Sequence, residues 1–217
     1  MRVLVLSEKG GVGKSFISAN VVAPALFLLD GEVKQKLLEI DSVNFTSAVL
    51  KKTQILDIQQ ISIRKKAEEV QKSKTALLDE LKSGKQNNGA DINKDIYGEM
   101  EKAISKMMAD NVNVVDVGAN LVIEFLEIMR AKKLMGYFDY IFVVSDTNAN
   151  DVALAQKTFR YISSFYDTRR MCYVINRYND AFESTLQKFN IQECVIRIHE
   201  VDYYSEKIFK QQMTLFD

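Results

Sequence analysis

Residues 3–15 read VLVLSEKGGVGKS, an apolar run followed by a loop with three glycines and a closing Lys-Ser pair. Glycines let the main chain wrap closely around phosphate oxygens, and a helix that begins at Lys14 would point its N-terminal amides at the same negative charge. In such a loop Lys14 reaches the β- and γ-phosphates of a nucleotide, and the Ser15 hydroxyl holds Mg²⁺. The stretch therefore predicts a strand, a phosphate-binding loop and a helix, in that order.

One position departs from the usual phosphate-loop pattern G-x-x-x-x-G-K-[ST], and one position that the pattern leaves open holds an unusual residue. Glu8 stands where the first glycine is expected, and a second lysine, Lys9, lies just inside the loop. The run K-G-G-V-G-K-S with its early lysine resembles the deviant Walker A box of the ParA/MinD family of P-loop ATPases. This resemblance implies that Lys9 reaches across a dimer to the partner's nucleotide. A chance Gly/Lys-rich turn is the alternative, but the strand before the loop and the helix after it favour the motif.

The rest of the chain alternates between strand-like and helical patterns. We expect strands at residues 2–6, 36–40, 112–117, 140–145, 171–175 and 194–198, and helices at residues 15–29, 121–134, 150–166, 181–189 and 203–213. Pro24 should bend or restart the first helix. The repeated units predict an α/β fold with a doubly wound, mainly parallel sheet flanked by helices, and they place ligands at the carboxyl ends of the strands.

The segment 57–108 interrupts this alternation. Ile58 and Ile61, with further apolar residues up to position 81, indicate one or two charged helices, and a regular apolar stripe runs from position 92 to 107. We therefore expect a divergent helical segment within a single P-loop domain that spans residues 1–217. The hydrophobic content of 47% is enough for one substantial core.

The overall charge gives no sign of a surface for nucleic acid or membranes, and the hydropathy argues against a membrane-spanning helix. The 29 basic and 29 acidic residues balance, so a surface for DNA or an anionic membrane would have to be a local patch. The longest apolar run, at residues 21–29, contains Pro24 and falls short of the ~20 residues that a spanning helix needs. The N-terminal apolar run ends at once in the glycine loop and is too short for a signal peptide. We expect a cytoplasmic protein for which membrane binding is disfavoured.

Two predicted strands carry carboxylates near their ends, at the edge of the sheet that holds the phosphate loop. Asp41 follows Glu39 and Ile40, and Asp116 lies in the run VVDVGAN at residues 114–120. Asp41 is suited to orient water near the γ-phosphate, and Asp116 is suited to hold the magnesium shell through water. Unrelated strand-end acids are the alternative. We expect Lys9, Lys14 and Asp41 to be catalytic and Ser15, Asp41 and Asp116 to hold the metal.

These acidic runs extend the resemblance. The first is similar to the Walker A′ box of ParA-like proteins, although Glu39 replaces the first aspartate of D-x-D and Ser42 replaces a proline, so a catalytic role for Glu39 stays open. The form D-x-G-A-[NS] at Asp116 resembles the plasmid-borne StbB/TraL-type relatives.

Asn176 ends a late strand, where the family's asparagine pairs with the adenine edge. By itself, an exposed turn asparagine is almost equally plausible at this position. The resemblance implies ATP and Mg²⁺ as cofactors. The expected nucleotide contacts are Lys9, Gly10, Gly11, Val12, Gly13, Lys14, Ser15, Phe16, Asn176 and Arg177.

The resemblance also implies how the protein works. It implies a slow ATPase that dimerises face to face around two nucleotides and is stimulated by a partner. Plasmid or DNA partition, with nonspecific DNA binding and a small DNA-binding adaptor, is the favoured role. Local patches for DNA are Lys157, Arg160, Arg169 and Arg170, or Lys207 and Lys210. A MinD-like membrane-associated positioning ATPase and a TraL-like conjugation accessory ATPase are the alternatives, whereas a nitrogenase-type iron-sulfur reductase would need bridging cysteines that the chain lacks.

The two cysteines and the single histidine suggest no further chemistry. Cys172 and Cys194 form no C-x-x-C motif and have no histidine nearby, so both are expected to be buried structural thiols. His199 has no second imidazole with which to share a metal, and we expect it at a strand end or on the surface.

Overall fold

The computed structural model describes residues 1–42, 53–63, 94–191 and 193–199. The strands are β1 (Val3–Leu6), β2 (Gln35–Asp41), β3 (Leu56–Ser62), β4 (Val114–Val117), β5 (Tyr140–Ser145), β6 (Met171–Tyr178) and β7 (Cys194–His199). The helices are α1 (Lys14–Ile17), α2 (Ala23–Leu29), α4 (Lys94–Ala109), α5 (Val122–Ala131), α6 (Ala149–Ser163) and α7 (Glu183–Gln187). The predicted helix at 203–213, Lys207 and Lys210 lie outside the described residues.

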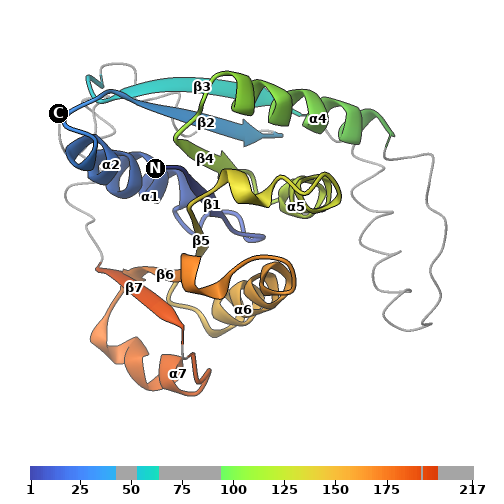
Figure 1. The fold of residues 1–217 in the computed structure, drawn as a ribbon. Helices are drawn as coiled ribbons and strands as arrows, with labels where there is room; N and C mark the ends of the chain where they lie inside the picture. The colour runs from blue at the N-terminus through green and yellow to red at the C-terminus, as the bar shows by residue number, and fades with distance from the viewer. Residues whose placement is uncertain (43–52, 64–93, 192, 200–217) are drawn as a thin grey trace, which may run out of the picture.

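The described strands form one seven-stranded parallel sheet in the order β3-β2-β4-β1-β5-β6-β7 (Figure 1). The chain starts in the middle of the sheet with β1, builds outward to β3, and returns through β4 to build the other half. This reversal beside β1 creates the crevice at which open α/β sheets bind ligands. The predicted doubly wound, parallel α/β fold is therefore confirmed.

Helices cover both faces of the sheet, and alternate residues of β1 show how. Leu4 and Leu6 belong to the core shared with α4, α5 and α6, whereas Val3 and Val5 pack with residues of α1 and α2. Figure 1 shows these two groups of helices on opposite sides of the sheet. Burial on both faces explains why the strand is a continuous apolar run.

The structure corrects the helical prediction for the start of segment 57–108. Ile58 and Ile61 lie on β3, paired in parallel with Leu37 and Ile40 of β2. This strand is outermost in the described sheet and half-exposed, so polar residues interrupt its apolar ones and hide the strand pattern. The later apolar stripe does form a helix, because residues of α4 such as Met100 and Met107 are fully buried. The part at 64–93 lies outside the described residues.

Pro24 interrupts the first helix as expected. A π-helical turn at Ser18–Val22 separates α1 from α2, and the Ala23 amide donates to the Ser18 carbonyl, five residues earlier. Proline lacks an amide hydrogen and its ring clashes with the carbonyl four residues before it, so the wider turn accommodates Pro24 without ending the helix. In the described part of the chain, none of the helices is long and apolar enough to cross a bilayer.

Candidate nucleotide-binding site

The glycine loop follows β1, the central strand of the sheet, and leads directly into α1. Gly11 and Gly13 have φ angles of 79° and 87°, in the left-handed region that favours glycine. At Gly13 a β-carbon would lie 2.2 Å from the Asn176 side-chain nitrogen. The loop geometry therefore requires glycine at position 13 for two independent reasons.

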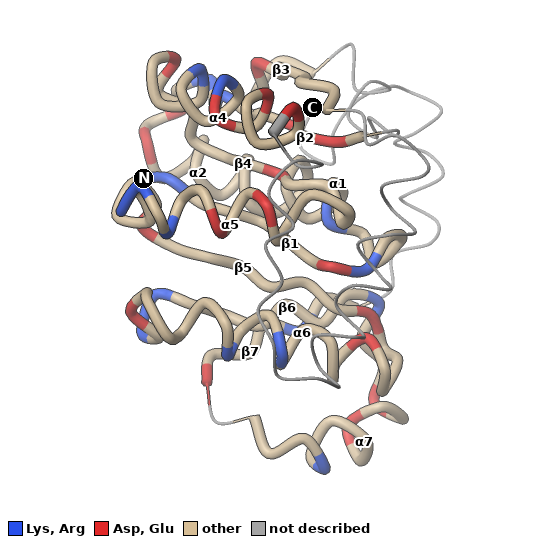
Figure 2. Tube along the Cα trace, turned by 90° about the vertical axis from the view of Figure 1, so that its right-hand side faces the viewer, with Lys and Arg blue, Asp and Glu red and all other residues tan. Residues whose placement is uncertain are grey.

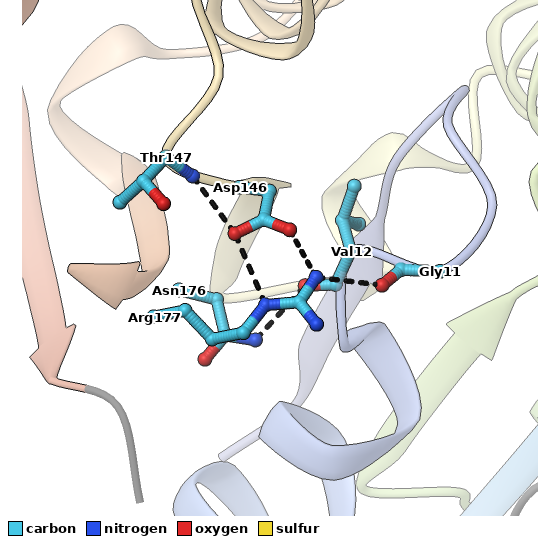
Figure 3. A network of polar contacts seen from close by, with 6 residues as sticks. All are labelled: Gly11, Val12, Asp146, Thr147, Asn176 and Arg177. Atoms are coloured by element: carbon cyan, nitrogen blue, oxygen red, sulfur yellow. Dashed lines mark hydrogen bonds and ion pairs between the residues drawn. The ribbon is translucent and has the colours of Figure 1, made fainter. Parts of the chain in front are cut away.

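Two residues at the end of β6 hold this loop from the side (Figure 3). The Asn176 Nδ2 donates to the Val12 carbonyl at 3.0 Å, and the Arg177 guanidinium donates to the Gly11 carbonyl at 3.0 Å. Arg177 also forms an ion pair with Asp146, with its Nε 3.1 Å from the carboxylate. Asn176 and Arg177, expected as nucleotide contacts, thus come together with the phosphate loop and hold its carbonyl groups.

A second group of side chains lies under the N-terminus of α1. Glu39 and Asp116 are directly paired in neighbouring strands, and both are only 2% exposed. The Ser15 hydroxyl donates to Glu39 at 3.3 Å, and Gln60 of β3 donates to the other Glu39 oxygen at 3.4 Å. The structure therefore places the Glu39 carboxylate beside Ser15, at the start of α1.

Asp116 has the most perturbed environment in this group. Burial removes its carboxylate from water and raises its pKa, and this effect is partly offset by the Lys14 charge and the nearby Ser15 hydroxyl, while the Asp41 charge raises it further. Within the described residues, the Asp116 Oδ2 is buried without a hydrogen-bond partner. A buried acceptor without a partner, beside a lysine and a serine hydroxyl, suits a magnesium-bound water.

Asp41 reaches the same place from the end of β2. A β-carbon at Gly118 would lie 2.7 Å from the Asp41 side-chain carbon, and the Gly118 amide donates to the Ile40 carbonyl at 2.7 Å. Gly118 therefore leaves space for the Asp41 carboxylate between β2 and β4. Ser15, Asp41 and Asp116, the predicted metal set, lie at one edge of the sheet.

The other predicted contacts have different surroundings. Lys9 and Gly10 are exposed on the loop, as a residue that reaches a second chain must be. Phe16 is half-buried and packs against the core beneath α1. Their roles toward a nucleotide stay predictions. Among the described residues, no group of three or more His, Cys, Asp or Glu side chains could hold a metal alone. Magnesium here would need nucleotide phosphates and water as additional ligands.

Sequence reasoning missed two residues of this site, Asp146 and Thr158. Asp146 follows β5 and fixes Arg177, and Thr158 of α6 donates to Glu8 in the phosphate loop. The glutamate at a glycine position indicated that Glu8 has a specific contact. Its partner could not be identified from the sequence, because Thr158 is 150 residues away in the chain. Nothing local in the sequence indicated Asp146.

Solved structures with a similar fold include two whose match covers nearly the whole chain. The MinC:MinD cell division protein complex of Aquifex aeolicus has a TM-score of 0.53 and 16% identity, covering 99% of this chain and 88% of that one. A plasmid partition protein of Borrelia burgdorferi B31 bound to AMPPNP has a TM-score of 0.50 and 14% identity, covering 97% and 89%. This chain has the MinD/ParA-type fold. The two structural matches confirm the resemblance to the ParA/MinD family that the sequence motifs predicted. No protein-family model and no curated protein matches the sequence.

Proposed function

We propose that this protein is an ATPase that binds Mg-ATP, forms a nucleotide-sandwich dimer and acts as an ATP-driven switch in plasmid or DNA partition. The observation that carries the proposal is the buried contact set under the phosphate loop, in which Lys14 and Ser15 face an Asp116 oxygen that lacks a partner among the described residues. A phosphate-binding loop beside an unsatisfied acidic acceptor suits a magnesium nucleotide, because in such sites the loop Ser and a strand-end Asp hold the metal.

Each residue then has a defined part. Lys14 offsets the charge of the β- and γ-phosphates, Ser15 and Asp116 hold the magnesium shell, and Asp41 orients the attacking water. Bound Mg-ATP supplies the phosphoanhydride and the cation that neutralises charge on the phosphates. Lys9 is exposed and free to approach the nucleotide of a second chain. Binding of AMPPNP to the Borrelia protein supports an adenine nucleotide.

Partition is the favoured role, and a few exposed basic residues on and near α6 support DNA binding. Lys157 and Arg160 are exposed on this helix, and Arg170 is exposed just before β6. Arg169 contributes less, because it pairs with Asp167 at 2.8 Å. Figure 2 shows basic and acidic positions interspersed along the described chain. DNA affinity would therefore depend on ATP-driven dimerisation, because a dimer presents two copies of these basic residues to the same DNA.

The MinD-like alternative has its own support. The Aquifex MinD complex matches this fold as well as the partition protein does. Membrane association in that role would require a surface or tail that binds anionic lipid only in the ATP-bound dimer.

Two assays test nucleotide binding and separate the partition role from the MinD-like role. We expect Lys14→Ala to weaken Mg-ATP binding roughly 10- to 100-fold, because it removes a charged hydrogen-bond donor. The matched control Lys132→Ala, on the surface at the end of α5, should bind ATP as the parent does. DNA and anionic liposomes are then offered to the parent with ATP and with ADP. Retention on DNA that needs ATP and falls steeply with salt supports partition, and retention on liposomes alone supports the MinD-like role.

A further inference from the structure

The two cysteines of the chain lie opposite each other on neighbouring strands. Cys172 of β6 is the direct register partner of Cys194 of β7 in the parallel ladder. Directly paired residues of neighbouring strands point to the same face of a sheet, and the strands lie about 4.8 Å apart. Disulfides join residues whose α-carbons are roughly 4.4 to 6.8 Å apart. The backbone therefore places both thiols within reach of a single bond.

The two thiols differ in exposure, which corrects the expectation that both are buried. Cys172 is buried, whereas Cys194 is exposed at the start of β7, the strand at the opposite edge of the described sheet from β3. Burial raises the pKa of the Cys172 thiol, and a hydrogen bond to Cys194 raises it further. The direct pairing of the two residues brings their side chains together on one face of the sheet. An oxidant from solvent meets Cys194 first, and Cys172 lies behind it as a resolving thiol.

We propose that Cys172 and Cys194 are a modification site that forms a reversible disulfide with a peroxide as the oxidant. Peroxide transfers one oxygen to the Cys194 sulfur, which gives a sulfenic acid and releases one water. The Cys172 sulfur then attacks the Cys194 sulfur, the S–S bond forms, and the hydroxyl leaves with the Cys172 proton as a second water. In total, two thiols and one hydrogen peroxide give one disulfide and two waters. A dithiol reductant reverses the step.

The bond would add a covalent link between β6 and β7, which the parallel ladder and side-chain contacts such as that of Arg197 with the Tyr178 ring now join. The disulfide would close a covalent loop from Cys172 to Cys194. This loop contains Asn176 and Arg177, which donate hydrogen bonds to the phosphate loop. Closing a loop restricts the unfolded chain more than the folded one, so the oxidised protein should unfold at a higher temperature. Because neighbouring parallel strands offer limited freedom to adjust the S–S geometry, the bond should also be readily reduced.

The test uses the full chain, treated with hydrogen peroxide and then blocked with a thiol reagent. We expect the intact mass to fall by two hydrogens, a crosslinked peptide pair that contains both cysteines, and a rise in Tm that dithiothreitol reverses. Cys194→Ser should show none of these changes. Cys172→Ala should instead accumulate a sulfenic acid at Cys194 that dimedone traps. The parent protein alone decides the outcome if a variant fails to fold.

Three results would overturn the proposal. Both thiols could still react with the blocking reagent after peroxide treatment, which would show that no bond forms. Peroxide could join two chains through Cys194, which would assign the exposed thiol to contacts between copies. The intramolecular bond could form and leave Tm unchanged, which would contradict the closed-loop argument.

Discussion

The Glu8 carboxylate accepts a 2.6 Å hydrogen bond from the hydroxyl of Thr158, a residue of α6 that is 1% exposed. Glu8 occupies the position at which phosphate loops usually have glycine. Through this contact, the glutamate at the glycine position attaches the start of the loop to α6, the helix that packs against β5. Lys9 follows Glu8 directly, so the same bond restricts the backbone that presents Lys9.

We predict that Thr158→Val lowers the free energy of unfolding by about 1 to 2 kcal/mol, because it removes a hydrogen bond to a charged group while keeping the side-chain shape. Urea unfolding followed by circular dichroism measures this change. Glu8→Gln is the control, since its amide oxygen still accepts from Thr158 and should keep most of the stability. Equal stability of Thr158→Val and the parent would show that solvent replaces this bond without cost.

A pair of glycine variants tests the loop geometry. Gly13→Ala should lower Tm by several degrees and abolish ATP binding, because its β-carbon would collide with Asn176 and its backbone is left-handed. Gly10→Ala is matched to it, since no described atom lies within 4 Å of the new β-carbon and its φ is not left-handed. Gly10→Ala should keep the parent's Tm. Differential scanning fluorimetry of both variants gives the comparison.

Asp41→Asn should reduce ATP hydrolysis by at least about 100-fold while ATP still binds, because the variant loses the carboxylate that, on our proposal, orients the attacking water. Gly118→Ala should reproduce much of this loss, since its β-carbon would displace the Asp41 carboxylate. Phosphate release and binding of a fluorescent ATP analogue separate the two effects. Normal hydrolysis by Asp41→Asn would remove Asp41 from the catalytic set.

Asp116→Asn should weaken the dependence of ATP binding on magnesium. The amide keeps the size of the side chain and removes the charge that would hold the metal's water ligands. Titration with ATP in the presence of Mg²⁺ and of EDTA should give nearly equal affinities for the variant and different affinities for the parent. A variant that responds to Mg²⁺ like the parent would exclude Asp116 from the metal site.

Lys9→Ala should bind ATP as a monomer and lose both ATP-dependent dimerisation and hydrolysis, because in the proposed dimer the exposed Lys9 charge would act on the nucleotide of the other chain. Light scattering with AMPPNP measures the dimer directly. Lys9→Arg, which keeps the charge, is expected to retain more dimer than Lys9→Ala. Dimerisation of Lys9→Ala at the parent's level would leave Lys9 an ordinary loop residue.

The parts of the fold that sequence predicted well are those whose chemistry is local. The glycine loop and the buried strands are continuous in sequence, and burial on both faces makes strands such as β1 apolar throughout. Strand β3 escaped prediction because it has a partner on only one side in the described sheet, so Gln59 and Gln60 are tolerated on it. The ion pair between Asp146 and Arg177 escaped for another reason: only the assembled sheet brings the ends of β5 and β6 together.

The hydrogen bond from Asn176 to the Val12 carbonyl joins residues that are 164 positions apart in the chain. During synthesis, the glycine loop therefore leaves the ribosome long before the residue that supports it. Contacts of such large sequence separation form late in folding, because a long loop must close first. Nucleotide affinity should thus appear only when β6 has docked, and ATP would act as a ligand that selects completely folded chains over partly folded ones.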